Sequence, residues 1–178
     1  MKITLIRHGK VDMQWQKAYT SRAYDRACSA YDLAPIVPID NLQIQRDAEV
    51  IYVSSLSRSR RTAEQLFGMQ DFIETKLLDE VPLRSFCDCR ISLPLWLWNV
   101  GGRLQWLWQS RRQREGRIAT GKRAARLISG LLKKDQDCIL VSHGFYMRTL
   151  VKELKRQGFA INKSGMGIAN LAQIIATK

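Results

Sequence analysis

The sequence predicts an α/β fold of three layers, in which helices cover both faces of a mostly parallel central sheet. Three short apolar runs, at residues 3–6, 49–54 and 138–142, indicate buried strands. Segments whose apolar residues recur at helical spacing follow these runs. Strands that alternate with helices are typical of a parallel sheet with both faces covered. A tryptophan-rich segment is expected to add a helical insertion.

Length and composition indicate a single domain over residues 1–178, with the insertion at about 90–116. The chain has 178 residues, of which 46% are hydrophobic, enough for a sizeable core. The N-terminus enters a strand pattern directly and the four cysteines are scattered, so we expect a cytoplasmic protein with reduced thiols. Cys87 and Cys89 have the wrong spacing for a zinc site, and we expect neither a metal nor a cofactor.

The first strand delivers Arg7-His8-Gly9 to its carboxyl end. In an open α/β sheet, ligands bind just beyond the carboxyl ends of the strands. The last of the three apolar runs stops in the same way, at His143-Gly144, and the chain has two histidines in all. One such histidine would suit a hydrogen-bonded strand end, but two in the same context indicate a shared site for a small anionic substrate.

The segment after the first strand is polar and aromatic and contains an expected helix. Tyr24, Ala27, Tyr31 and Ala34 are spaced along one helix face, and Pro35 ends the pattern.

The strand at 49–54 is followed by an expected helix at 58–67, with Gly68 near its end. Arg58 then lies in the first helical turn, at the same edge of the sheet as His8. A cation there opposes the helix macrodipole, which favours anions. The mismatch is explained if a phosphate binds at this end, because helix N-termini attract phosphate.

A further strand is expected at 72–78, and it leads to Asp79 and Glu80. Because the side chains of adjacent residues diverge, at most one of these carboxylates can point into the site.

Residues 93–108 contain four of the five tryptophans. The run is too short, and too interrupted by a charge and a glycine pair, to span a bilayer. We expect a helix that packs over the site, because Trp96, Val100, Leu104 and Leu107 share helical spacing. A membrane-surface or partner-binding role is the alternative, since tryptophan beside a basic helix suits a membrane interface.

The remaining elements complete the domain. A helix at about 117–134 is expected to bury four apolar residues and to expose its arginines. Those four residues are Ile118, Ala125, Ile128 and Leu132. A helix at 145–157 and a terminal strand near 171–176 follow.

The formal net charge of +13 is concentrated in one segment. Residues 103–134 carry ten lysines and arginines against one acid, Glu115. We expect one basic surface that attracts phosphorylated substrates, nucleic acid or an anionic membrane. A solvated helix face that aids solubility explains the same charges.

Four segments carry a family resemblance. In chain order they are Arg7-His8-Gly9, residues 54–63, Leu78-Asp79-Glu80 and Val141-Ser142-His143-Gly144. They resemble the signatures of the histidine phosphatase superfamily, also called the phosphoglycerate mutase-like family, and they span most of the chain. After the third segment the chain departs from the Gly-x-Trp-Glu-Gly type pattern of that family.

The resemblance implies a nucleophile and a set of phosphate ligands. His8 would attack phosphorus and form a phosphohistidine, which water then hydrolyses. Arg7 and Arg58 would grip the phosphate oxygens, since guanidinium groups bind them in pairs. His143, if protonated, would add a donor, and Gly144 would lie beside it at the substrate.

The resemblance also assigns the proton donor to Glu80. This carboxyl group would protonate the leaving alkoxide and then activate water. Asp79 is the first alternative.

The expected function is therefore a phosphomonoester phosphatase acting on a phosphorylated small molecule or a phosphoprotein. A mutase that uses the same phosphohistidine is one alternative. The other is a weakly catalytic module that binds nucleic acid or an anionic membrane through residues 103–134. The presence of all five candidate polar side chains favours catalysis.

Overall fold

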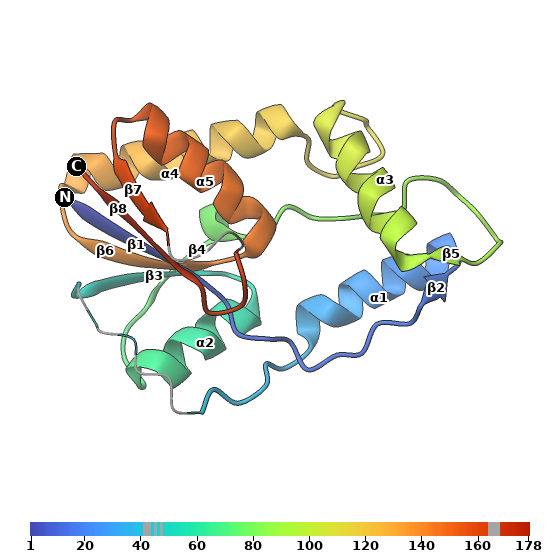
Figure 1. Cartoon of the computed structure of the whole chain (residues 1–178), viewed down its shortest axis with the longest axis horizontal. Helices are drawn as coiled ribbons and strands as arrows, with labels where there is room; N and C mark the ends of the chain where they lie inside the picture. Colours follow the sequence, from blue (N-terminus) through green and yellow to red (C-terminus); the bar gives the residue numbers. More distant parts are fainter. Residues whose placement is uncertain (41–43, 45, 47, 164–167) are drawn as a thin grey trace.

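The computed structural model describes residues 1–40, 44, 46, 48–163 and 168–178 (Figure 1). Its main sheet has six strands in the order β4-β3-β6-β1-β8-β7. They are β1 (Lys2–Arg7), β3 (Val50–Ser54), β4 (Ile73–Thr75), β6 (Cys138–Ser142), β7 (Ala160–Lys163) and β8 (Gln173–Thr177). Strands β4, β3, β6 and β1 are parallel, while β8 pairs antiparallel with both β1 and β7. The expected mostly parallel sheet is confirmed.

Helices cover both faces of this sheet (Figure 1). Successive strand residues point to opposite faces. Leu5 and Leu140 therefore pack with α4 (Arg117–Lys134) and α5 (Gly144–Arg156), whereas Ile6 and Val141 pack on the side of α2 (Ser57–Phe67). The three-layer arrangement follows from this alternation.

A smaller unit extends from the sheet, at the end of the molecule opposite the two termini (Figure 1). It contains α1 (Ser21–Leu33), α3 (Leu95–Leu107) and the strand pair β2 (Ala18–Tyr19) and β5 (Leu93–Pro94). Its core is Trp98, which is fully buried and stacks on Tyr24 at 5.5 Å between ring centroids. The indole Nε1 donates to the carbonyl of Tyr19 at 2.9 Å. This unit is the expected helical insertion together with the helix that follows the first strand.

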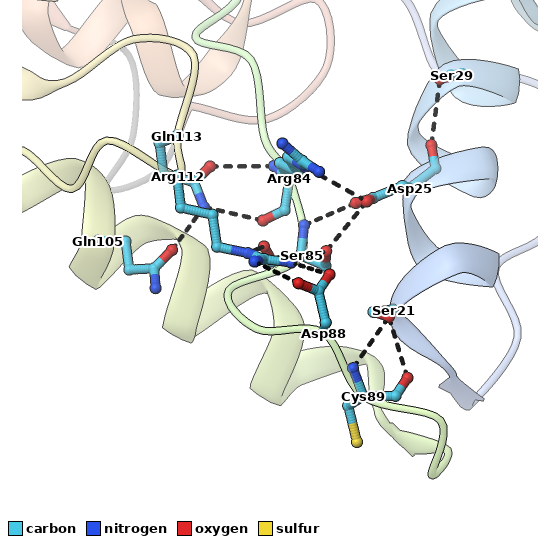
Figure 2. Close-up of polar contacts among 10 residues, drawn as sticks. All are labelled: Ser21, Asp25, Ser29, Arg84, Ser85, Asp88, Cys89, Gln105, Arg112 and Gln113. Carbon is cyan, nitrogen blue, oxygen red and sulfur yellow. Dashed lines mark hydrogen bonds and ion pairs between the residues drawn. The ribbon is translucent and has the colours of Figure 1, made fainter.

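Figure 2 shows how the connection from the sheet to α3 is fastened to α1. The Asp25 carboxylate accepts hydrogen bonds from the backbone N–H of Ser85 at 2.7 Å and from its hydroxyl at 3.1 Å. From the other side, Arg112 donates to the carbonyl of Ser85 at 2.7 Å and pairs with Asp88 at 2.6 Å. The connection is thus held by side chains from two other parts of the chain.

The strand expected at 72–78 is shorter than the pattern predicts. Only β4 is extended, and Lys76–Leu78 form a 3-10 turn. The hydroxyl of Thr75 accepts the N–H of Leu77 at 3.2 Å, which favours the turn over continued pairing.

The buried face of α4 also differs from the expected one. Ile118 is 56% exposed, and the fully buried Thr120 takes an inward position. Its hydroxyl can be buried because it donates to the carbonyl of Gly116 and accepts from Nε1 of Trp106. Not all arginines of α4 face solvent, since the side chain of Arg123 is 16% exposed.

The helix α3 forms where expected, but its apolar stripe points the wrong way for packing. Trp96, Val100, Leu104 and Leu107 are 64%, 48%, 40% and 40% exposed. The inward face instead contains Trp98 and the glycine pair 101–102. A Cβ at residue 101 would lie 2.5 Å from the side chain of Phe86, and one at residue 102 would lie 2.6 Å from that of Leu83, so the glycines permit close packing there. Within the described chain, no helix is long and apolar enough to cross a bilayer.

Candidate active site

The two histidines lie side by side at the carboxyl edge of the sheet. Parallel pairing of β1 with β6 places Arg7 opposite Ser142, so His8 and His143 leave the sheet at the same level. The backbone N–H of His8 donates to the carbonyl of Ser142 at 2.9 Å. The two ring centroids are 5.0 Å apart. Residues that are 135 positions apart in sequence therefore share one site.

The His8 imidazole is held in one tautomer. Its Nδ1 is 2.7 Å from the carbonyl oxygen of Gly9, which can only accept, so Nδ1 carries the proton. Nε2 is left with a free lone pair. Burial lowers the pKa of His8 from 6.5 to about 3, and the charges of Arg58 and Arg7 act in the same direction. The ring is thus a neutral base with its nucleophilic nitrogen unprotonated at neutral pH.

Arg58 lies in the first turn of α2, as expected, and is 1% exposed. Its Nε donates to Nδ1 of His143 at 3.1 Å, and its Nη1 pairs with the carboxylate of Asp32 at 2.9 Å. The guanidinium also lies 5.1 Å from the ring centroid of Tyr31. Two residues of α1 therefore help to fix this buried cation.

His143 has a different environment from the expected one. Because Nδ1 accepts from Arg58, Nε2 carries the proton and donates to the hydroxyl of Ser54 at 2.8 Å. The side chain is fully buried, and burial together with the charge of Arg58 lowers its pKa well below 6.5. It is not among the residues that line the cavity. The role of His143 as a donor to phosphate stays a prediction.

The Arg7 guanidinium lines the cavity and is only partly hydrogen-bonded. One of its Nη groups donates to the carbonyl of Ile168, while its Nε is buried without a hydrogen-bond partner among the described residues. A Cβ at Gly144 would lie 2.8 Å from this Nε. Gly144 does not line the cavity itself, and its place in the site is to leave room for Arg7.

The adjacent carboxylates of Asp79 and Glu80 bind different parts of the chain. Asp79 accepts hydrogen bonds from Ser54 and Ser55 at 2.7–2.8 Å and so fastens the end of β3. Glu80 accepts the N–H groups of Phe145 and Tyr146 at 3.2 and 3.0 Å and so caps α5. Both residues line the cavity.

A cavity of about 760 Å³ opens in front of His8. At the sheet it is lined by Arg7, His8 and Arg58, and farther out by α1, α3 and the loop that precedes α4. The residues that sequence reasoning did not assign to the site include Trp15, Asp25, Tyr31, Asp32, Asn99, Arg103, Arg114 and Arg123. Tyr31 was signalled by the helix pattern of 24–34. Arg103, Arg114 and Arg123 were signalled by the charge of segment 103–134. The others had no signal, because their position depends on how the insertion packs.

The basic segment 103–134 is divided between the cavity and the surface. Arg103, Arg114 and Arg123 line the cavity. Arg103 lies 3.6 Å above the ring centroid of Phe145, and Arg123 pairs with Glu115 at 3.1 Å. The expectation of one basic surface is corrected to this extent, because part of the charge faces the cavity. No group of three or more metal-ligating side chains occurs among the described residues.

Comparisons with known proteins agree with this geometry. The sequence model of the histidine phosphatase superfamily (branch 1) matches residues 3–172. No curated protein sequence matches significantly. Among solved structures, a phosphoserine phosphatase mutant from Entamoeba histolytica with bound phosphoserine is 18% identical, with a TM-score of 0.61 over 98% of this chain and 89% of that one. A mycobacterial glucosyl-3-phosphoglycerate phosphatase is 17% identical, with a TM-score of 0.61 over 98% of this chain and 88% of that one. At these identities the structures demonstrate a shared fold.

Proposed function

The chain belongs to branch 1 of the histidine phosphatase superfamily, a family of phosphoric monoester hydrolases, and on that basis we propose that it cleaves phosphate monoesters through a phosphohistidine on His8. The observation that carries the proposal is the His8 ring itself. Its Nδ1 donates to the carbonyl of Gly9, its Nε2 has no hydrogen-bond partner among the described residues, and it lines a cavity beside Arg7 and Arg58.

In the first step the Nε2 lone pair attacks phosphorus, and the bond from phosphorus to the ester oxygen breaks. The leaving oxygen takes a proton and departs as an alcohol. In the second step water attacks the phosphohistidine, the P–N bond breaks, and inorganic phosphate leaves. The neutral ring required at the start is maintained by the lowered pKa of His8.

Two guanidinium groups, those of Arg7 and Arg58, balance the negative charge of the transferred phosphoryl group, each in a different way. Arg7 lines the cavity and offers the Nη hydrogens that Ile168 does not bind to a phosphate oxygen, while its buried Nε faces Gly144. Arg58 is already bonded to His143 and Asp32, so it contributes mainly a fixed positive charge at the cavity wall. His143 acts as a positioning residue that ties Arg58 to Ser54.

Glu80 is proposed as the group that exchanges the proton. It lines the cavity, and its carboxylate is oriented by the N-terminus of α5. Asp79 lines the cavity too, and it accepts three hydrogen bonds from residues 54 and 55, while Glu80 accepts three from residues 81, 145 and 146. The choice of Glu80 therefore rests on the family resemblance of the Leu78-Asp79-Glu80 segment. We expect Glu80→Gln to slow alkyl phosphates more than aryl phosphates, whose leaving groups need less protonation. Equal losses on both would move the role to Asp79.

The cavity supports a phosphorylated small molecule as the substrate rather than a phosphoprotein. Its volume of about 760 Å³ suits a metabolite-sized ligand, and its walls contain aromatic as well as charged side chains. All four cysteines are free, which supports the cytoplasmic location proposed from the sequence.

The test is His8→Ala with a generic aryl phosphate and a panel of phosphorylated metabolites and phosphopeptides, including phosphoserine and phosphoglycerates. We expect loss of at least about a thousandfold in kcat, with unchanged circular dichroism. Rapid quenching of the unaltered protein should trap one acid-labile phosphate. Since the chain has two histidines, peptide mapping assigns it to His8 or His143.

Undiminished turnover in His8→Ala, or trapped phosphate on His143, would remove the proposed nucleophile. Transfer of phosphate between the hydroxyls of a phosphoglycerate, faster than its release, would instead identify the mutase alternative.

A further inference from the structure

The outward side of α3 is an apolar surface, which we name the α3 face and define as Trp96, Val100, Leu104, Leu107 and Trp108. All five side chains are at least 40% exposed, and none is charged. A surface helix normally turns polar residues outward, so a contiguous row of this kind marks an interaction site. In Figure 1 the helix lies in the smaller unit, at the end of the molecule opposite the two termini.

Exposed cations border the α3 face. Arg111 follows it in sequence, and Arg117 begins α4, whose second residue Ile118 donates its N–H to the side chain of Gln109 at 3.3 Å. Both arginines are exposed and make no ion pair with any described residue. Ile118 is itself 56% exposed and extends the apolar surface toward α4.

The α3 face also adjoins the cavity. Asn99 and Arg103 line the cavity from α3. On a helix, residues three or four apart are neighbours, which places Asn99 beside Trp96 and Arg103 beside Leu107. The apolar row therefore reaches the helix edge at which the cavity begins.

We propose that the α3 face docks on an anionic phospholipid surface. Tryptophan and leucine would enter the interface between headgroups and acyl chains, and the bordering arginines would pair with lipid phosphates. A second copy of the chain fits less well, because the contact would bring together two proteins that each carry a net charge of +13. Nucleic acid fits less well too, because cations border the row but do not interleave with its aromatic side chains.

The experiment is vesicle flotation of the full chain. One set of vesicles contains phosphatidylcholine alone, and the other contains phosphatidylcholine with about 30% phosphatidylglycerol. We expect binding to the anionic vesicles, at least about tenfold weaker binding to the neutral ones, and a blue shift of tryptophan fluorescence on binding.

Two pairs of variants locate the contact. Trp96→Ser combined with Leu107→Ser should reduce binding at least about tenfold, whereas Met69→Ser, at an exposed residue (84%) after α2, should not. Arg111→Glu combined with Arg117→Glu should reduce binding to the anionic vesicles by a similar factor, whereas Lys152→Glu on α5 should not.

Three results would overturn the proposal: no binding to either vesicle, binding that the α3 variants leave unchanged, or a dimer in light scattering that Trp96→Ser with Leu107→Ser dissociates. Hydrolysis of a soluble aryl phosphate provides an independent readout. Because none of the altered side chains lines the cavity, their kcat should match that of the unaltered protein even where vesicle binding is lost.

Discussion

At the scale of single residues, the site depends on two neutral imidazoles that are oriented by different partners. The carbonyl of Gly9 fixes His8, and the guanidinium of Arg58 fixes His143. His8 is 2% exposed and His143 is fully buried. Protonating either ring in the folded protein would bury a new charge beside an existing one, so both have pKa values below 6.5.

This burial predicts a loss of stability in mild acid. Between pH 6.5 and about 3 the unfolded chain binds a proton at His8 that the folded chain excludes, so the free energy of unfolding falls as the pH falls. The slope is about 1.4 kcal/mol per pH unit for each such histidine. Urea unfolding of the unaltered protein and of His8→Asn, from about pH 7 to pH 4.5, should give a shallower decline for the variant. Parallel curves would show that His8 titrates normally in the folded state.

A second residue-scale prediction concerns the space beside Arg7. In Gly144→Ala the new methyl would lie 2.8 Å from Nε of Arg7 and push the guanidinium away. We expect kcat/KM to fall at least about tenfold, with the fold retained. Gly130→Ala is the matched control, because nothing lies within 4 Å of its Cβ position. The control should keep full activity and gain up to about 1 kcal/mol of stability. Equal activities would show that Arg7 tolerates the methyl.

At the scale of elements, strands were predicted better than helix faces. The strands at 2–7, 50–54 and 138–142 are buried on both faces of the sheet. They therefore show as nearly continuous apolar runs in the sequence and can be recognised without knowing which residues face which layer. The inward face of α3 could not be read from hydrophobicity, because its outward face is the more continuous apolar row. The glycine pair 101–102, which permits close packing against residues 83 and 86, was the signal that mattered.

The orientation of α3 predicts opposite results for two tryptophans of one helix. Trp98 is fully buried, stacks on Tyr24 and contacts Phe86 at 4.8 Å between ring centroids. Trp98→Ala should lower the free energy of unfolding by about 3–5 kcal/mol. Trp96→Ala should change it by less than about 0.5 kcal/mol, since that side chain is 64% exposed. Urea unfolding of both variants measures these changes. A larger loss of stability in Trp96→Ala than in Trp98→Ala would mean that α3 is rotated about its axis.

At the scale of the whole molecule, many of the positive charges surround the cavity. Arg7, Arg58, Arg103, Arg114 and Arg123 all line the cavity. The segment count alone predicted a strongly basic region but not its direction, because three of these arginines reach the cavity only through the packing of α3 and α4. The two strand-His-Gly motifs, by contrast, predicted their own convergence, since parallel strands end at one edge of a sheet.

This concentration of cations predicts that catalysis is sensitive to salt. We expect kcat/KM for a phosphate monoester to fall several-fold between about 20 and 200 mM NaCl, as the field in the cavity is screened. Arg114→Gln should reduce this dependence, because Arg114 is an exposed cation in the cavity wall with no ion pair among the described residues. A flat salt profile in the unaltered protein would show that long-range attraction contributes nothing to substrate capture.

The pairing of β1 with β6 separates chemistry from selectivity in evolution. Main-chain hydrogen bonds between two apolar strands set the spacing of the two imidazoles, whereas the outer wall of the cavity comes from α1 and α3. Substitutions in that wall, apart from Tyr31 and Asp32, which contact Arg58, can therefore accumulate without disturbing the two imidazoles. Descendants of one ancestral protein can acquire new substrates by remodelling the wall while they inherit an unchanged nucleophile.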